Sequence, residues 1–78
     1  MRPWRRCAVC SGPAEAHEIV TRGAGGPREA WNTLFLCRGC HRYFHDAGWV
    51  RFVAAYPALR GKVLEARRRA GKHEEQRT

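Results

Sequence analysis

The spacing of the cysteines constrains the fold of this chain more than any other feature. Cys7 and Cys10 form one C-x-x-C pair, and Cys37 and Cys40 form a second pair after an insert of 26 residues. A chain of 78 residues buries a small core and usually needs an additional cross-link to be stable. Two such pairs are typical of a closed tetrahedral site in which four thiolates bind one structural Zn²⁺.

Disulfide bonds and thiol redox chemistry are the alternative interpretations of the same cysteines. The N-terminal stretch MRPWRRCAVC has no apolar segment of the kind that directs export to an oxidising compartment. No helix N-terminus is evident at the first pair to activate its thiols. We therefore favour zinc and expect a cytoplasmic location. No apolar run approaches the length of a membrane span, so we expect no membrane partner.

The charge of the chain points to a polyanionic partner. Lys and Arg number 15 against 7 Asp and Glu, which gives a net charge of +8, and thirteen of the cations are arginine. Guanidinium groups bind phosphate in a planar, bidentate manner. Such an excess in a small domain is most often associated with nucleic acid. The alternative is a protein whose positive charge serves only solubility.

The region between and after the cysteine pairs predicts a small α+β fold. AEAHEIV (14–20) alternates and ends in β-branched residues, which indicates a short strand, and WNTLFLC (31–37) indicates the returning strand. TRGAGGPRE (21–29) between them is typical of a glycine-rich loop. RGCHRYFHDAG (38–48) is expected to form a helix that begins at the second cysteine pair and ends near Gly48.

The C-terminal part predicts further helices. WVRFVAAYP places an apolar face at helical spacing, which we interpret as core rather than as a surface for stacking bases. PALRGKVLEARRRAGK (57–72) predicts a basic helix, and the tail KHEEQRT is expected to be frayed. Residues 1–78 are interpreted as one domain, with a motif core of about 7–47 and a basic helical extension of about 49–72. The expected inward residues are Trp49, Phe52, Val53, Tyr56, Leu59, Val63 and Ala66.

Three of the four histidines occur at positions suited to binding one cation. His41 and His45 are four residues apart on the expected helix, so their imidazoles share one face. His17 lies on the expected first strand, which could fold over that helix. Together they predict a three-ligand site with open positions, as a catalytic metal requires. The alternative for each histidine is an ordinary surface or hydrogen-bonded residue.

The pattern of His17, Asn32 and His41 between two C-x-x-C pairs resembles that of the HNH endonucleases, members of the ββα-metal (His-Me finger) group. HEIVTRGAGG resembles the first strand and Gly-Gly loop of that family. WNTLFLCRGCHRYFH resembles its return strand, knuckle and metal-binding helix. The resemblance runs from Cys7 to about His45. It implies a ββα-metal core stapled by a four-cysteine zinc site and followed here by C-terminal helices.

The resemblance also implies roles for individual residues. His17, His41 and His45 match the ligands of a catalytic divalent ion, with Mg²⁺ or Mn²⁺ expected and Zn²⁺ or Ni²⁺ compatible with imidazole ligands. Asn32 matches the asparagine that holds the hairpin and orients the general base. Glu18 stands where the family usually has the histidine that acts as this base. A carboxylate with an ordinary pKa of about 4.3 is a weaker base. Three readings stay open: Glu18 as the base, Glu18 as a further metal ligand, and a domain that does not cleave.

These observations predict a metal-dependent DNA endonuclease that hydrolyses phosphodiester bonds, by nicking, double-strand cutting or junction cleavage. The alternative is a non-catalytic zinc-ribbon module that binds nucleic acid. Because so small a chain would cut two strands only as an assembly, a homodimer or a larger phage or bacterial complex is expected. The resemblance suggests the cytoplasm of a prokaryotic or phage-infected cell. The arginines expected to contact DNA are Arg22, Arg38, Arg42, Arg67, Arg68 and Arg69.

Overall fold

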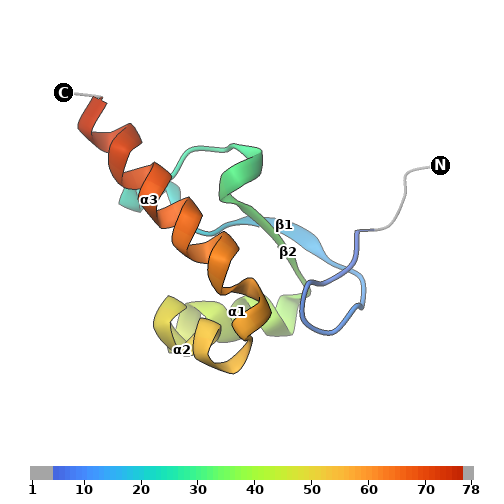
Figure 1. The fold of residues 1–78 in the computed structure, drawn as a ribbon. Helices are drawn as coiled ribbons and strands as arrows, with labels where there is room; N and C mark the ends of the chain where they lie inside the picture. The colour runs from blue at the N-terminus through green and yellow to red at the C-terminus, as the bar shows by residue number, and fades with distance from the viewer. Residues whose placement is uncertain (1–4, 77–78) are drawn as a thin grey trace.

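The computed structural model describes residues 5–76, with side chains described as far as residue 71. Within this part of the chain, a two-stranded antiparallel sheet is accompanied by three α-helices (Figure 1). The predicted small α+β fold is therefore confirmed. The strands and helices are β1 (Glu15–Glu18), β2 (Thr33–Leu36), α1 (Arg38–Ala47), α2 (Trp49–Ala55) and α3 (Arg60–Gln76). Three 3-10 turns join them: η1 (Arg22–Ala24), η2 (Ala30–Asn32) and η3 (Pro57–Leu59).

Both strands are shorter than the apolar runs that predicted them. The ladder pairs Glu15 with Leu36 and Glu18 with Thr33. Beyond Glu18, the backbone N–H of Ile19 still donates to the Asn32 carbonyl at 2.8 Å. The next N–H, that of Val20, instead donates to the Asn32 side chain at 2.9 Å. Strand pairing therefore ends where the asparagine side chain takes over the hydrogen bonding.

The segment that joins the strands is folded rather than open. It contains η1, which ends at Gly25 with a φ of 92°, in the left-handed region that glycine adopts most easily. Gly26 is buried, and a Cβ there would lie 1.8 Å from the Val20 carbonyl oxygen. Only glycine fits at that position. The loop is thereby held close to the end of β1.

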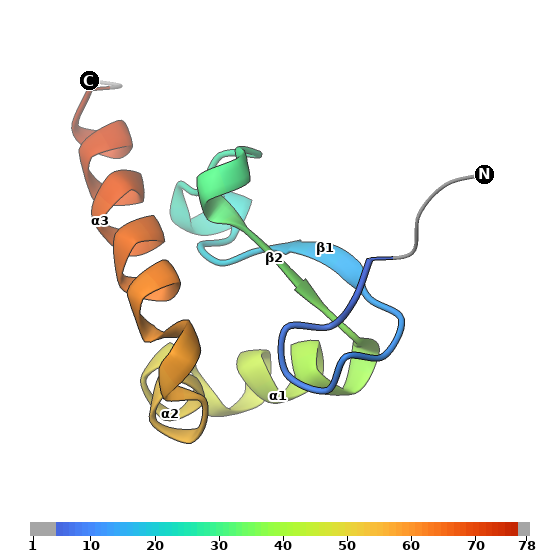
Figure 2. The same cartoon turned by 45° about the vertical axis from the view of Figure 1, so that its right-hand side comes forward.

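The first cysteine pair forms a tight loop attached to the sheet. Cys7 N–H donates to the Gly12 carbonyl at 2.8 Å, and Ala8 N–H donates to the Phe35 carbonyl of β2 at 2.9 Å. In Figure 2 this N-terminal loop lies beside the end of β2 and the start of α1. The second cysteine pair lies at the start of α1, with Cys37 as its N-cap, so the two C-x-x-C pairs meet there.

Helix α1 ends at Gly48, as predicted, with φ 87° and ψ 163°. Helix α2 follows at once and buries Phe52 and Val53. The Phe52 ring is fully buried, 4.7 Å from the Phe44 ring and 5.2 Å from the Tyr56 ring between centroids. The apolar face of 49–56 is therefore core, as the sequence predicted.

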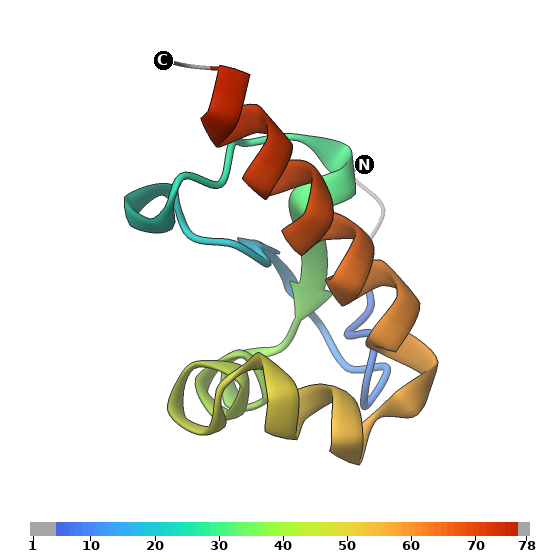
Figure 3. The same ribbon diagram turned by 60° about the vertical axis from the view of Figure 1, so that its left-hand side comes forward.

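Helix α3 packs across the molecule against η2 and α2 (Figure 3). Val63 and Ala66 are fully buried, and Leu59 is half-buried. The prediction of a frayed tail, KHEEQRT, is wrong for residues 72–76, because the helical backbone continues to Gln76. The last two residues of that tail, 77–78, lie outside the described part of the chain. None of the helices described here is long and apolar enough to cross a membrane.

Candidate metal centres

The four cysteines gather into one cluster in the folded chain. Their sulfur atoms all lie within 4.8 Å of one another, so the cluster could hold a metal ion such as zinc. Backbone N–H groups point at the sulfurs, as those of Val9 and Cys10 do toward Cys7 at 3.4 and 3.5 Å. Cys40 N–H donates to Cys37 Sγ at 3.4 Å, which also caps α1. This is the arrangement that the spacing of the cysteines predicted.

The surroundings of the cluster affect the four thiols unequally. Burial raises the pKa of Cys7, but several backbone N–H groups outweigh it and lower that pKa to about 6. The Cys40 N–H lowers the pKa of Cys37. Burial and the neighbouring sulfurs raise the pKa of Cys40. For Cys10, the Gly12 N–H lowers the pKa, but the adjacent Cys37 and Cys7 thiols raise it overall. Full deprotonation of all four therefore needs the positive charge of a metal.

The three predicted histidines also come together. His17 projects from β1 and pairs in register with Leu34, on the sheet face that packs toward α1. Its ring stacks on that of His41 at 3.3 Å between centroids, with 14° between the planes. His45 lies one turn further along α1, 4.7 Å from His41 and edge-on. Burial lowers the pKa of His41, and the charges of His17 and His45 lower it further.

One atom of this histidine cluster has no partner. His17 Nε2 is buried and makes no hydrogen bond to the described residues. A buried polar atom of this kind is uncommon unless something else satisfies it. The rings, however, are not in coordination geometry. Imidazole lone pairs lie in the ring plane, so two stacked and nearly parallel rings direct them within separate, nearly parallel planes that do not meet at one ion. Convergence on one ion requires rotation of a ring about its side-chain torsions.

Asn32 holds the end of the hairpin closed. Its side chain is fully buried and bonds to Val20 twice, accepting from the N–H and donating to the carbonyl at 2.9 Å. It also donates to the Pro27 carbonyl at 2.8 Å. This asparagine therefore joins both ends of the glycine-rich loop. Its side-chain bonds fall on Val20 and Pro27 rather than on Glu18.

Glu18 leaves the sheet on the opposite face from His17. It pairs with Thr33, and alternation along the strand separates the two adjacent side chains. His17 and Glu18 nevertheless both line a surface hollow of about 270 Å³, together with Arg28 and Thr33. Arg28 was not among the predicted DNA-contacting residues. It belongs to an irregular loop without periodicity, and only the packing of that loop brings it beside β1.

The predicted arginines are exposed, but most of them make contacts within the chain. Arg42 forms an ion pair with Asp46 at 3.6 Å. The Arg67 guanidinium lies 4.4 Å from the centre of the Trp49 ring. Arg22 and Arg38 are exposed on η1 and at the start of α1.

The last two arginines of the run on α3 bind a carboxylate of their own helix. Arg68 and Arg69 both pair with Glu65. The Arg69 guanidinium also lies 5.9 Å from the centre of the Trp31 ring, which belongs to η2. Two of the arginines predicted to contact DNA therefore form ion pairs within α3. The arginines of this run also brace α3 against the rest of the fold.

Comparison with known proteins gives no match to this chain: no family model, no curated protein and no solved structure is similar to it. The site is therefore interpreted from its own residues.

Proposed function

We propose that this protein is a metal-dependent DNA endonuclease of the HNH type, with a ββα-metal core and a structural zinc. One observation carries the proposal. His17 from β1 meets His41 and His45 from α1 in a single cluster, beside the cysteines at the start of the same helix. A coincidence of ordinary surface histidines does not account for an imidazole nitrogen that is buried and unpaired.

The residues of the histidine cluster fit a divalent cation after a small rearrangement. Three imidazoles suit Zn²⁺ or Ni²⁺, while Mg²⁺ and Mn²⁺ would take additional oxygen ligands from water and phosphate. His17 Nε2, which is buried without a hydrogen-bond partner, is the ligand atom that such an ion would bind. A bound ion would stabilise negative charge on the phosphate and on the departing 3′ oxygen.

The remaining groups would position DNA and move a proton. Arg28 lines the same hollow as His17, and its guanidinium can bind a phosphate of the substrate. Glu18 also lines that hollow and would accept a proton from the attacking water. The Glu18 side chain emerges from the sheet face opposite to that of His17. In this proposal its carboxylate therefore reaches the phosphate through the hollow that both residues line. In this proposal the carboxylate of Glu18, in the lining of the hollow, takes the role that a histidine base has in the HNH endonucleases.

Plasmid cleavage with added Mg²⁺, Mn²⁺, Ni²⁺ or Zn²⁺ tests the proposal. We expect wild type to cleave, and His41→Ala to lose activity with its zinc content unchanged. Absence of cleavage by wild type with every ion would contradict the enzyme assignment. The assay should include linear, nicked and four-way junction DNA, since small nucleases differ in the substrate they select.

The role of Glu18 requires its own variants. Glu18→Gln should be nearly inactive, and Glu18→His should restore cleavage with a shifted pH profile. Glu29→Gln is the matched control, because Glu29 is an exposed carboxylate in the neighbouring loop and does not line the hollow. Full activity in Glu18→Gln would remove Glu18 as the base and leave the nuclease proposal standing.

The second candidate function is a zinc module that binds nucleic acid without cleaving it. The near-parallel stacking of His17 on His41 favours it, since this stacking is not a metal-binding geometry. Both candidates predict DNA binding that weakens with salt. Only the nuclease predicts products that depend on a divalent ion and on His41.

A further inference from the structure

A second hollow lies on the outward face of the sheet, away from the histidine cluster. Its volume is about 500 Å³, and its lining includes Thr33 and Phe35 of β2. These two residues alternate with Leu34 and Leu36, which are buried on the inner face. Phe35 is half-buried and is the aromatic residue of the hollow.

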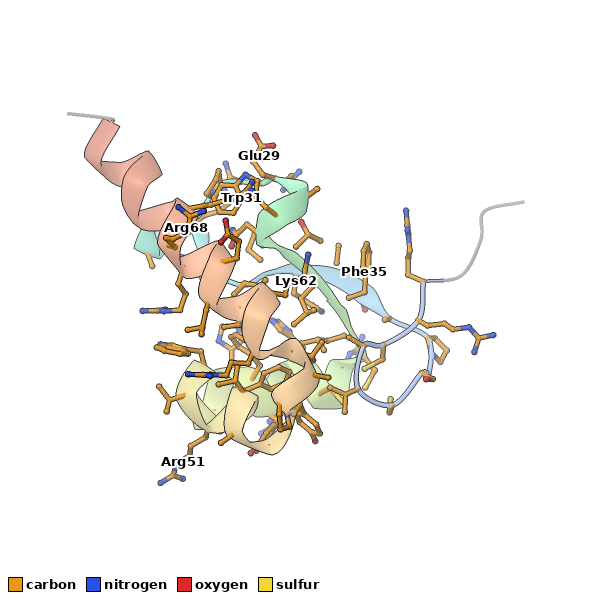
Figure 4. The ribbon with its side chains drawn as sticks, viewed as in Figure 1. Glu29, Trp31, Phe35, Arg51, Lys62 and Arg68 are labelled. Carbon is orange, nitrogen blue, oxygen red and sulfur yellow. The ribbon has the colours of Figure 1, made fainter. Side chains whose placement is uncertain are left out.

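Three cationic side chains border this hollow, and they come from opposite ends of the chain. Arg5 and Arg6 precede the first knuckle, and Lys62 extends from α3. In Figure 4, Lys62 and Phe35 are seen next to one another along β2. No carboxylate lines the hollow, and none of the three cations forms an ion pair within the part of the chain that the structure describes. Lys62 Nζ donates to the Ala30 carbonyl at 3.4 Å, a contact that leaves its positive charge uncompensated. The three charges can therefore act on an anion, unlike those of Arg68 and Arg69, which face Glu65.

The hollow also offers a flat surface. The Arg5 guanidinium lies over the Phe35 ring, 4.8 Å from its centre, so Arg5 and Phe35 form one layered pair in which Arg5 covers a face of the ring. Bases stack on aromatic rings and on guanidinium planes in proteins that bind single strands. A base in a duplex is already stacked on its neighbours and cannot use such a surface. Phosphate-binding cations around an aromatic ring therefore fit an unpaired segment better than a duplex.

We propose that this outward face binds single-stranded nucleic acid, with one base stacked on Phe35 and Arg5 and the adjoining phosphates against Arg6 and Lys62. The inference goes beyond cleavage and shares with the proposed function only the premise that the ligand is a nucleic acid. Thr33 lines both this hollow and the one that contains His17 and Arg28. A bound strand can therefore run from one hollow to the other along the edge of β2.

Fluorescence anisotropy with a labelled single-stranded DNA oligonucleotide tests this binding, with the zinc-loaded full chain and no other divalent ion added. Phe35→Leu keeps an apolar side chain but removes the ring, and we expect it to weaken binding by about fivefold or more. Phe35→Trp keeps a stacking surface and should retain the affinity. The melting temperature and zinc content of each variant establish that it is folded.

Lys62→Gln and Arg60→Gln form a matched pair for the electrostatic contact. Both remove one charge from the start of α3, but Arg60 does not line the hollow. We expect Lys62→Gln to lower the slope of log affinity against log salt by about 0.7, as the loss of one phosphate contact to a single strand requires. Arg60→Gln should leave that slope nearly unchanged.

The outcomes separate this inference from the proposed nuclease. Ring-dependent binding of single strands without cleavage of any substrate supports the binding face and rejects the enzyme. Equal loss of affinity in Lys62→Gln and Arg60→Gln would overturn the binding face, as would unchanged affinity in Phe35→Leu. Equal affinity for a duplex of the same sequence would also overturn it. None of those results bears on cleavage.

Discussion

The cysteine and histidine clusters lie at neighbouring positions on α1, yet they differ in how completely the protein prepares them. At the start of the helix, backbone N–H groups point at the sulfurs, and all four ligand atoms lie within 4.8 Å of one another. One residue further, His41 is held by stacking on His17 rather than by hydrogen bonds, and the Nε2 of His17 is unpaired. The cysteine cluster is ready for an ion. The histidine cluster requires a side-chain rotation first.

The physical origin of this difference is side-chain length. A cysteine has one torsion between its backbone and its sulfur, so a tight knuckle determines where the ligand atom lies. A histidine has two, and its ring can stack on a neighbour when no ion competes for the lone pair. A backbone can therefore prearrange thiolates without metal, whereas imidazoles depend on the ligand for their final orientation.

The largest effect on stability is expected from disrupting the cysteine cluster. Cys40→Ser, or removal of metal by a chelator, should abolish cooperative unfolding, because binding of structural zinc supplies about 10 kcal/mol or more in small zinc domains. Circular dichroism during heating and zinc content per chain provide the measurement. His41→Ala should keep one zinc per chain. A metal-free protein that melts as wild type does would show that the core alone stabilises the fold.

Asn32→Ala tests what holds the histidine strand in place without metal. It leaves the Val20 N–H and the Pro27 carbonyl without their partner in a buried site, so we expect a loss of about 2–4 kcal/mol in unfolding free energy. Urea denaturation measures it. Thr33→Ala is the control, since it removes a single exposed bond to the Glu29 carbonyl and should cost less than about 1 kcal/mol. Equal losses in both variants would contradict the assigned role.

A second divalent ion should bind the histidine cluster and hold its imidazoles in a metal-binding orientation, as the backbone already does for the cysteine sulfurs. In zinc-loaded wild type, Ni²⁺ at about 100 times its dissociation constant should stabilise the fold by about 2.7 kcal/mol. The thermal shift should disappear in His41→Ala and persist in Glu29→Gln. A shift of the same size in His41→Ala would place the second ion elsewhere and would count against a histidine metal site.

The smallest effect on stability is expected in α3, which packs against η2 and α2 and contributes no residue to either cluster. Hydrogen bonds from Arg68 and Arg69 lower the pKa of Glu65 to about 2, from an ordinary value of 4.5. Because the folded pKa is the lower one, this contribution is fully present above about pH 4.5 and is lost as the pH falls through about 2. Glu65→Gln should flatten stability against pH in that window, as followed by acid titration of the circular dichroism signal. An unchanged pH profile in this variant would contradict the assignment.

Sequence patterns predicted much of the fold and of the candidate site. The helix from the second cysteine pair to Gly48, the apolar face of 49–56 and the shared face of His41 and His45 follow from spacing and periodicity. The sequence also predicted that His17 joins these histidines, and the packing of β1 on α1 brings them together. The strand ends were less predictable. A run such as WNTLFLC looks continuous, but the Asn32 side chain replaces a ladder bond and turns its first residues into η2. Such a competition depends on a partner twelve residues away.

The sequence by itself determined the two C-x-x-C pairs and the helix that carries His41 and His45, because local spacing fixes both. Only the tertiary structure decided which charges are available. It paired Arg68 and Arg69 with Glu65, placed Arg28 in the lining of the hollow that His17 also lines, and brought Arg5, Arg6 and Lys62 to the hollow that contains Phe35. It also placed Glu18 on the opposite sheet face from His17. Side chains distant in sequence acquire their neighbours only through packing, and strand register sets the face on which each one emerges.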